Sequence, residues 1–344
     1  MAPLPKSLQE LDSAQARLCL DIEKFGNLKS DINFASKKVL VAVSGGIDSA
    51  ALLIISTLLA RKSGGRVFCA HVDHNLRSVS VEDAVFVEKL CADLGVGFEK
   101  KSVDAKGYAE LNSIGLEEAG RILRYDFFNY CLKKFDADFL LLAHHLGDLC
   151  EDVVMRLIRG TGWPALAGMD AYDPDRKLLR PLLETNKRQL ETFLKSIKCS
   201  WREDESNSSN KYTRNRVRNN IIPLLLNENP SFGINVARLK NQADLDQDYW
   251  ESEISRCLDQ IKRLEDGSFF APSKILKQCH PALRCRLYKK IIELLGKGHA
   301  LADSINLLEN SYVAKKTGSV FQFPSNKTAT ITKQGIVFKF SQRY

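Results

Sequence analysis

The chain has 344 residues, too many for a comfortable single core, so two domains are expected. Its 44% hydrophobic and 27% charged residues are ordinary for a soluble globular protein, and no apolar run approaches the roughly 20 residues that a membrane-spanning helix needs. The formal net charge is +8, and nine cysteines without C-x-x-C spacing argue against a disulfide framework or an iron–sulfur site.

The N-terminal stretch predicts an amphipathic helix at residues 8–25 rather than a targeting segment. It has no uninterrupted apolar core, and its acidic residues argue against a transit peptide. We therefore expect an intracellular protein, located in the cytoplasm and without a membrane partner.

Residues 39–158 alternate short apolar strands with helical segments. This rhythm predicts an α/β fold with a doubly wound parallel sheet, covered by helices on both faces. In such sheets ligands bind at the carboxyl ends of the strands. The predicted strands are residues 39–43, 66–72, 98–103 and 138–143, and the predicted helices are residues 50–61, 81–94, 116–134 and 148–158.

The rhythm changes after residue 225, where the sequence places a domain boundary. Residues 1–225 would form the first domain and residues 226–344 a smaller, mainly helical domain. Helices are predicted at residues 232–261, 282–295 and 301–310, and the last stretch alternates like a hairpin of short strands.

A glycine-rich loop follows the first predicted strand. Its residues are Ser44, Gly45, Gly46, Ile47, Asp48 and Ser49, and a helix comes directly after them. Glycines let backbone N–H groups approach a phosphate, the helix N-terminus adds partial positive charge, and serine hydroxyls donate hydrogen bonds. The lysine of a Walker loop is absent, as is G-x-G-x-x-G. A tight strand–helix turn that is merely rich in glycine is the competing interpretation.

The string SGGIDS resembles the PP-loop of the N-type ATP pyrophosphatases, which cleave ATP between its α- and β-phosphates. The resemblance explains the missing lysine, because the loop would hold the leaving pyrophosphate and keep the α-phosphate open. Further stretches narrow the match: HVDHNLR, EEAGRILRYDFF, LAHHLGDLCED, RGTGWPALAGM, RPLLETNKRQLETFL and EDESNSSNKYTRNRVRNNIIPLL. In this order, over residues 37–225, they resemble the tRNA(Ile)-lysidine synthetases.

That resemblance implies a ligase that acts in two steps on tRNA(Ile) with a CAU anticodon. ATP would adenylate the C2 carbonyl oxygen of the wobble cytidine, and the side-chain amine of free L-lysine would then displace AMP. Charge that develops at the α-phosphate needs cations, and the candidates are Arg121, Arg124 and His144, with Arg124 favoured. ATP and Mg²⁺ would be the cofactors.

The second step needs carboxylates that hold the lysine ammonium and remove its proton. Asp48 and Asp148 each follow a predicted strand, and Glu151 lies at i+3 from Asp148, on the same helical face. Asp48 and Asp148 are also the candidate Mg²⁺ ligands. Asp148 could instead simply cap its helix. Gly147 departs from the family, which often carries an acidic or amide residue there.

Most of the basic excess lies between residues 176 and 218. This strip is either a solvated basic face or a tRNA-binding surface. Alternate spacing of Arg214, Arg216 and Arg218 would spread them around a helix axis, which suits a phosphate backbone better than one salt-bridge partner. The candidate tRNA-binding residues are Arg202, Lys211, Arg214, Arg216 and Arg218.

Several alternatives stay open at this point. Four histidines, His71, His74, His144 and His145, could hold zinc or be satisfied in the core. A tRNA thiolase would need cysteines for sulfur transfer, a GMP or asparagine synthetase would need a glutamine-hydrolysing domain, and an NAD synthetase would not need the basic strip. A non-catalytic nucleotide-binding RNA module is the alternative from another class. The chain could be a monomer or a homodimer.

Overall fold

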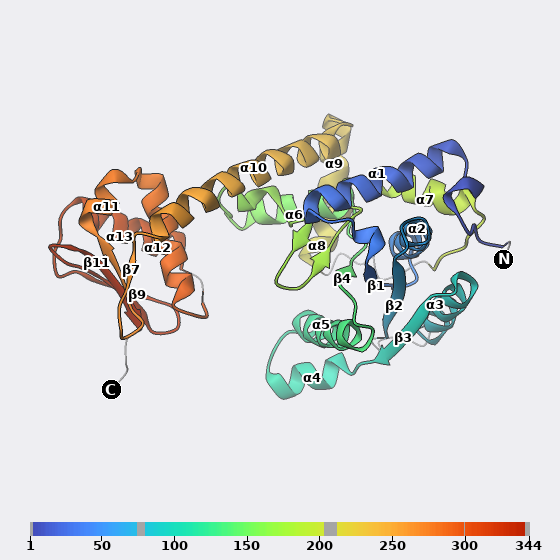
Figure 1. The fold of residues 1–344 in the computed structure, drawn as a ribbon, viewed down its shortest axis with the longest axis horizontal. Helices are drawn as coiled ribbons and strands as arrows, with labels where there is room; N and C mark the ends of the chain where they lie inside the picture. Colours follow the sequence, from blue (N-terminus) through green and yellow to red (C-terminus); the bar gives the residue numbers. More distant parts are fainter. Residues whose placement is uncertain (1–2, 74–79, 203–211, 299, 341–344) are drawn as a thin grey trace. The chain divides into compact units, whose positions relative to one another are not determined.

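A computed structural model describes residues 3–73, 80–202, 212–298 and 300–340 (Figure 1). The chain divides into two compact units, Met1–Asn241 and Gln242–Tyr344. The division falls inside the long helix α10 (Phe232–Leu258). The sequence places its boundary earlier, near residue 225. The first residues of α10 count with the first unit because Phe232, Val236 and Ala237 pack in one apolar cluster with Leu146 and its neighbours.

The first unit is built on a six-stranded sheet with the order β3-β2-β1-β4-β6-β5. In the described part of this sheet, β5–β6 is the one antiparallel pair and the other pairs are parallel. Strand β1 has β2 on one side and β4 on the other, so the strand order reverses there and the crevice lies outside the carboxyl ends of β1 and β4. The strands are β1 (Lys38–Ala42), β2 (Arg66–Asp73), β3 (Gly97–Ser102), β4 (Phe139–Leu141), β5 (Tyr172–Asp173) and β6 (Leu178–Leu179).

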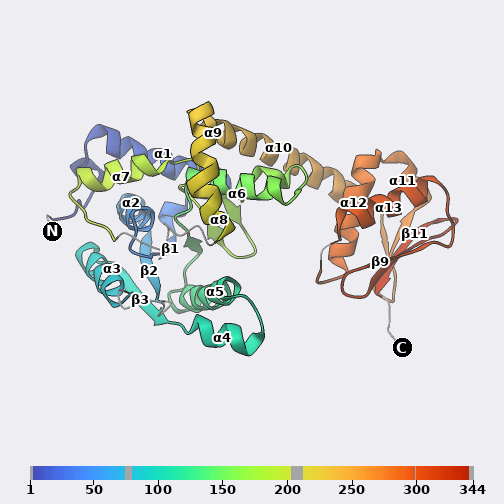
Figure 2. The same ribbon diagram turned by 180° about the vertical axis from the view of Figure 1, so that it is seen from behind.

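Helices cover both faces of this sheet, which confirms the predicted α/β class (Figures 1 and 2). Alternate residues of a strand point to opposite faces. Accordingly Val39 and Val41 pack with α2 and α7, whereas Leu40 packs with α5. The helices of the first unit are α1 (Ser13–Ser30), α2 (Ile47–Ser63), α3 (Ser80–Leu94), α4 (Ala105–Asn112), α5 (Leu116–Lys134), α6 (Leu146–Ile158), α7 (Lys187–Ser196), α8 (Thr213–Arg216) and α9 (Ile222–Glu228).

Some elements differ from the sequence prediction. Residues 8–25 form a short 3-10 turn (Leu8–Glu10) followed by α1, because the Asp12 side chain accepts the N–H of Gln15 at 2.9 Å and starts the helix there. Helices α4 and α7 and strands β5 and β6 were not predicted. The two strands are only two residues long, so no alternation of apolar and polar residues marks them.

The second unit combines helices with a five-stranded antiparallel sheet of order β7-β8-β11-β10-β9. The sequence predicts only a hairpin of short strands in the last stretch, where the structure has three strands; the other two come from residues 262–272, between α10 and the later helices. Its elements after α10 are β7 (Lys262–Arg263), β8 (Phe269–Pro272), α11 (Ser273–Gln278), α12 (Pro281–Leu294), α13 (Ala302–Val313), β9 (Val320–Phe323), β10 (Lys327–Ile331) and β11 (Gly335–Phe340). In the described part of the chain, no helix is both long and apolar enough to cross a membrane.

Candidate active site

The loop after β1 is closed by its own serines. The Ser49 hydroxyl donates to the Gly46 carbonyl at 3.1 Å, accepts the Ser44 N–H at 3.2 Å and lies 3.2 Å from the Ser44 hydroxyl. Gly45 has φ +98°, a conformation that other residues adopt only with strain. The first N–H groups of α2 have no partner within the helix, so this loop presents donors and a positive helix end to an anion.

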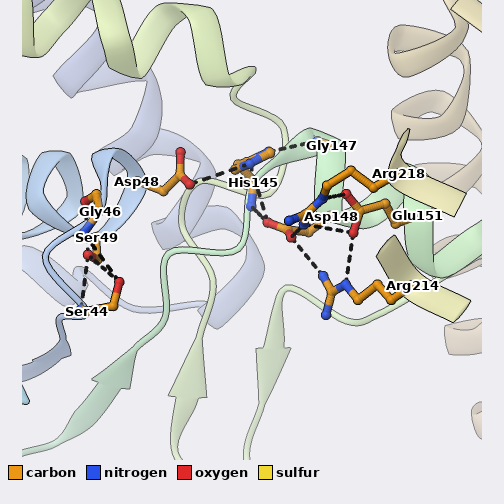
Figure 3. Close-up of polar contacts among 10 residues, drawn as sticks. All are labelled: Ser44, Gly46, Asp48, Ser49, His145, Gly147, Asp148, Glu151, Arg214 and Arg218. Carbon is orange, nitrogen blue, oxygen red and sulfur yellow. Dashed lines mark hydrogen bonds and ion pairs between the residues drawn. The ribbon is translucent and has the colours of Figure 1, made fainter. Parts of the chain in front are cut away.

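Asp48 lies in the first turn of α2 and reaches across the crevice toward α6 (Figure 3). Its Oδ2 is 3.7 Å from Nε2 of His145. Its Oδ1 is buried and has no hydrogen-bond partner among the described residues. Burial raises the pKa of Asp48 above its ordinary value. A buried carboxylate oxygen without a partner fits a site that receives a cation or a proton.

The start of α6 is held by a reciprocal cap. The imidazole Nδ1 of His145 accepts the Gly147 N–H at 2.9 Å, and Oδ2 of Asp148 accepts the His145 N–H at 2.9 Å. Asp148 therefore does cap its helix, which was one of its two interpretations. A Cβ on Gly147 would lie 2.6 Å from Cε1 of His145, so the ring takes this position only beside a glycine.

Asp148 and Glu151 form a buried carboxylate pair on one face of α6. Arg214 donates to Oδ1 of Asp148 at 2.8 Å and to Oε2 of Glu151 at 2.9 Å. Arg218 donates to the same two atoms, at 3.2 Å and 2.9 Å. Burial alone would raise the pKa of Asp148, but the imidazole of His145, the guanidinium of Arg214 and the backbone N–H of His145 hold that pKa below its ordinary value.

This arrangement corrects the expected placement of the basic residues. Arg214 and Arg218 do not spread around a helix axis; they stand four residues apart on one face and share one carboxylate pair. Arg216 is exposed and donates to the Thr213 hydroxyl at 3.0 Å.

Arg202 lies at the glycine-rich loop, away from this carboxylate pair. Its N–H donates to the Gly45 carbonyl at 3.0 Å, and its guanidinium pairs with Glu82 at 2.7 Å and Asp83 at 2.9 Å. Lys211 lies outside the described residues. The assignment of these basic residues to tRNA binding stays a prediction.

His144 is neutral at physiological pH, contrary to the expectation that it could act as a cation. Burial lowers its pKa to about 4. Its Nδ1 accepts a hydrogen bond from Nε of Arg180 at 3.0 Å, so the neutral ring carries its proton on Nε2. Sequence reasoning missed Arg180, which is buried and directly follows β6. Its place at the carboxyl end of a parallel strand was the available signal, but that strand is too short to be recognised.

Arg121 and Arg124 lie on exposed positions of α5. The Arg121 guanidinium stands 5.0 Å from the ring centroid of Tyr125, and the Arg176 guanidinium stands 5.6 Å from it. Burial lowers the pKa of Arg180, and Tyr125 and Arg121 also act on that pKa electrostatically. These arginines form a basic cluster that includes the partner of His144.

The remaining histidines give no support to a zinc site. His71 is buried, and its Nδ1 lies 2.8 Å from the Val43 carbonyl, as in a satisfied core histidine. His74 lies outside the described residues. Within the described ranges, no group of three or more His, Cys, Asp or Glu side chains is placed to hold a metal ion by itself.

Comparison with known proteins identifies the family. A model of the PP-loop domain matches residues 20–225. The tRNA(Ile)-lysidine synthase of Nitratidesulfovibrio vulgaris is 40% identical over 315 aligned residues, with 87% of this chain and 91% of that protein covered. The chain belongs to the tRNA(Ile)-lysidine synthase family.

Other members of the tRNA(Ile)-lysidine synthase family agree with this assignment. The protein of Clostridioides difficile is 30% identical over 312 residues, with 87% of this chain and 67% of that protein covered. The match to the Porphyromonas gingivalis W83 protein is 42% identical but covers 56% of this chain and 42% of that longer protein. Among solved structures, the U34-tRNA thiolase of Methanococcus maripaludis has a TM-score of 0.56 at 16% identity, covering 67% and 79% of the two chains, which supports the fold alone.

Proposed function

We propose that the chain is a ligase that joins free L-lysine to C2 of the wobble cytidine in tRNA(Ile) with a CAU anticodon. ATP would drive the reaction and leave as AMP and pyrophosphate. The observation that carries this proposal is the meeting of the PP-loop aspartate, Asp48, with the buried pair Asp148 and Glu151 at the sheet's crevice. The site thus combines hydrogen-bond donors for a phosphate with the carboxylates that an amine substrate needs.

In the first step the cytidine oxygen would attack the α-phosphorus and pyrophosphate would leave. The N–H groups of the loop and of the first turn of α2 would hold the departing pyrophosphate. Arg124 and the Arg180–His144 pair are the candidates for the charge that develops on the α-phosphate. Because His144 is neutral, it would act there as a hydrogen-bond donor through Nε2 and Arg180 would supply the positive charge.

The described residues also fit Mg²⁺, which is usually held by one or two carboxylates together with substrate phosphates. Asp48, with its buried and unpartnered Oδ1, is the better candidate ligand, and Asp148 is the second. When bound, the ion would neutralise charge on the phosphates.

In the second step the lysine side-chain amine would form a bond to C2 as the C2–O bond breaks and AMP leaves with the oxygen. The attacking ammonium must lose a proton. Asp148 and Glu151 are already neutralised by two arginines, whereas Asp48 has a raised pKa and an oxygen without a partner. Asp48 is therefore our candidate for the proton acceptor, with Asp148 and Glu151 shaping the field around the amine.

For the tRNA we propose the basic strip of residues 176–218 as the contact region, with Arg216 as the most exposed of the candidates that the structure describes. Arg202, Lys211, Arg214 and Arg218 complete the predicted set. A cytoplasmic location and a monomer or homodimer stay predictions.

The direct experiment mixes labelled lysine, ATP, Mg²⁺ and an unmodified tRNA(Ile) transcript with a CAU anticodon. We expect label in the RNA, with one AMP and one pyrophosphate formed for each lysine. A transcript whose wobble cytidine is replaced by uridine is the matched control and should stay unlabelled. If wild-type protein leaves the CAU transcript unlabelled, the proposed function is wrong; ATP binding without pyrophosphate release would instead indicate a non-catalytic RNA module.

A further inference from the structure

His145 stands between the two aspartates of the site, although sequence reasoning assigned it no role there (Figure 3). Its Nε2 lies 3.7 Å from Oδ2 of Asp48 and 3.6 Å from Oδ2 of Asp148. The two carboxylates come from different helices, α2 and α6. The edge of one imidazole ring therefore faces both.

The hydrogen bond at the other side of the ring defines where its proton lies. Nδ1 accepts the Gly147 N–H at 2.9 Å, so Nδ1 carries no proton in this arrangement. The neutral ring must then carry its hydrogen on Nε2, directed into the space between the two carboxylates. That polarity reduces the repulsion between Asp48 and Asp148.

Asp148 has further contacts that fix it, whereas Asp48 has few. Asp148 accepts the His145 N–H and pairs with Arg214 and Arg218. Besides His145, Lys187 and Arg218 act on Asp48 electrostatically. Among the described residues, Nε2 of His145 is the side-chain nitrogen that lies within 3.7 Å of the Asp48 carboxylate.

Gly147 makes this ring position available. A Cβ at residue 147 would lie 2.6 Å from Cε1 and 3.0 Å from Nδ1 of the ring, well inside van der Waals contact. Any other residue would force the imidazole to rotate or shift. The departure of this chain at Gly147 therefore has a structural consequence at both aspartates.

We infer that His145 is a positioning residue that holds the Asp48 carboxylate in place relative to Asp148 for the incoming lysine amine. Gly147 is required for this position of the His145 ring. The inference rests on the proposed function. It predicts that losing the Nε2–H impairs lysine transfer more than adenylation of the tRNA, because the lysine amine must lie between the two aspartates themselves, whereas in adenylation they would act only as candidate Mg²⁺ ligands.

The first test replaces His145→Asn. Asparagine is a good N-cap residue, so it can still accept an N–H at the start of α6, but it places no donor between the carboxylates. We expect an unchanged melting temperature, near-normal pyrophosphate release in the absence of lysine, and a fall in kcat/KM for lysine on the order of tenfold or more. Equal losses in both steps, or no loss in lysine transfer, would overturn the inference.

The second test is a double-mutant cycle with Gly147→Ala. Alone, this change should reproduce the lysine-transfer defect, because the new Cβ displaces the ring. In the His145→Asn background it should cause little further loss, since no ring remains to be displaced. Losses that simply add would show that the two residues act independently and would contradict the inference.

A third measurement does not depend on activity. Imidazole ¹⁵N chemical shifts of the wild-type protein report which ring nitrogen carries the hydrogen, and we expect the Nε2–H form at His145. The Nδ1–H form would overturn the inference even if the His145→Asn protein failed to fold. If the wild-type protein transfers no lysine, the proposed function fails and the inference falls with it. If the wild-type protein transfers lysine and the variants transfer it equally well, the inference alone fails.

Discussion

Asp48 and Asp148 face each other across the crevice, but their surroundings act on them in opposite directions. Burial raises the pKa of Asp48, whereas the imidazole of His145 and the guanidinium of Arg214 hold the pKa of Asp148 below its ordinary value. Pairs of carboxyl groups whose pKa values are driven apart commonly divide acid–base work between them. At the residue scale, Asp48 suits proton transfer and Asp148 suits a permanent negative charge.

Replacing Asp148→Asn tests that permanent charge. We expect lysine incorporation to fall by about a hundredfold or more, because the amide removes one of the carboxylates around the amine, while tRNA still binds. Asp152→Asn on the same helix is the matched control, since Asp152 pairs with Arg156 at 2.9 Å. Labelled-lysine incorporation and a filter-binding assay measure the two properties. Full activity in the Asp148→Asn protein would remove this residue from the site.

The neutral His144 predicts a pH dependence of stability. Burial lowers its folded-state pKa from 6.5 to about 4, so between these pH values the unfolded chain binds a proton that the folded protein does not. The free energy of unfolding should therefore fall as the pH drops from about 6.5 to 4, by on the order of 3 kcal/mol from this group.

Urea denaturation of the wild-type and His144→Gln proteins between about pH 4 and pH 7 isolates the contribution of His144 to the free energy of unfolding. The difference between their free energies of unfolding should change with pH over that window and level off above about pH 7. A difference that is independent of pH would mean that His144 titrates normally in the folded protein.

At the scale of elements, the contact between α6 and the segment that begins with α8 joins parts of the chain more than sixty residues apart. The segment continues as a π-helical turn, Val217–Ile221, a geometry that is frequent at functional sites. Arg214 and Arg218 neutralise the carboxylates of α6 and dock this segment there. The same arginines therefore influence both the fold and the site.

Charge reversal separates docking from tRNA binding. Arg216→Glu should weaken tRNA binding severalfold, because an exposed phosphate contact is lost. The slope of log affinity against log salt concentration should become shallower by about one.

Arg214→Glu should also lower the free energy of unfolding, by about 1–3 kcal/mol, because it adds a third carboxylate beside Asp148 and Glu151. Affinities at several salt concentrations and melting curves measure both effects. An unchanged salt slope for Arg216→Glu would argue against its contact with tRNA.

At the scale of the whole molecule, each unit has its own core, and the second contains a buried lysine. Lys327 is fully buried and donates to the carbonyls of Ile292, Gly296 and Gly298 at 2.8–3.0 Å. It thereby satisfies carbonyls at the end of α12 that would otherwise be buried without a donor. The lysine acts as a structural link between α12 and β10.

Lys327→Met should destabilise the second unit by about 2–4 kcal/mol, since the carbonyls lose their donor. Hydrogen exchange should accelerate in α12 and β10 and stay unchanged in β1. Lys339→Met, at an exposed position of the neighbouring strand, is the control and should have little effect. Uniform acceleration throughout the chain would show that the two units do not unfold separately.

The sequence alone determined the α/β class, the glycine-rich loop and the positions of Asp48 and Asp148 at strand ends. These features depend on local spacing: the alternation of strands and helices, and motifs within a few residues of each strand. The carboxyl ends of neighbouring parallel strands meet at one edge, so the approach of the two motifs could be predicted without coordinates.

Only the tertiary structure decided which side chains meet around those aspartates. The pairing of Arg214 and Arg218 with α6, the buried Arg180 and the position of His145 between the aspartates all depend on contacts between distant segments. No periodicity or spacing encodes them. Burial then set the charges, leaving His144 neutral and Asp48 with a raised pKa, because desolvation exists only once the chain has packed.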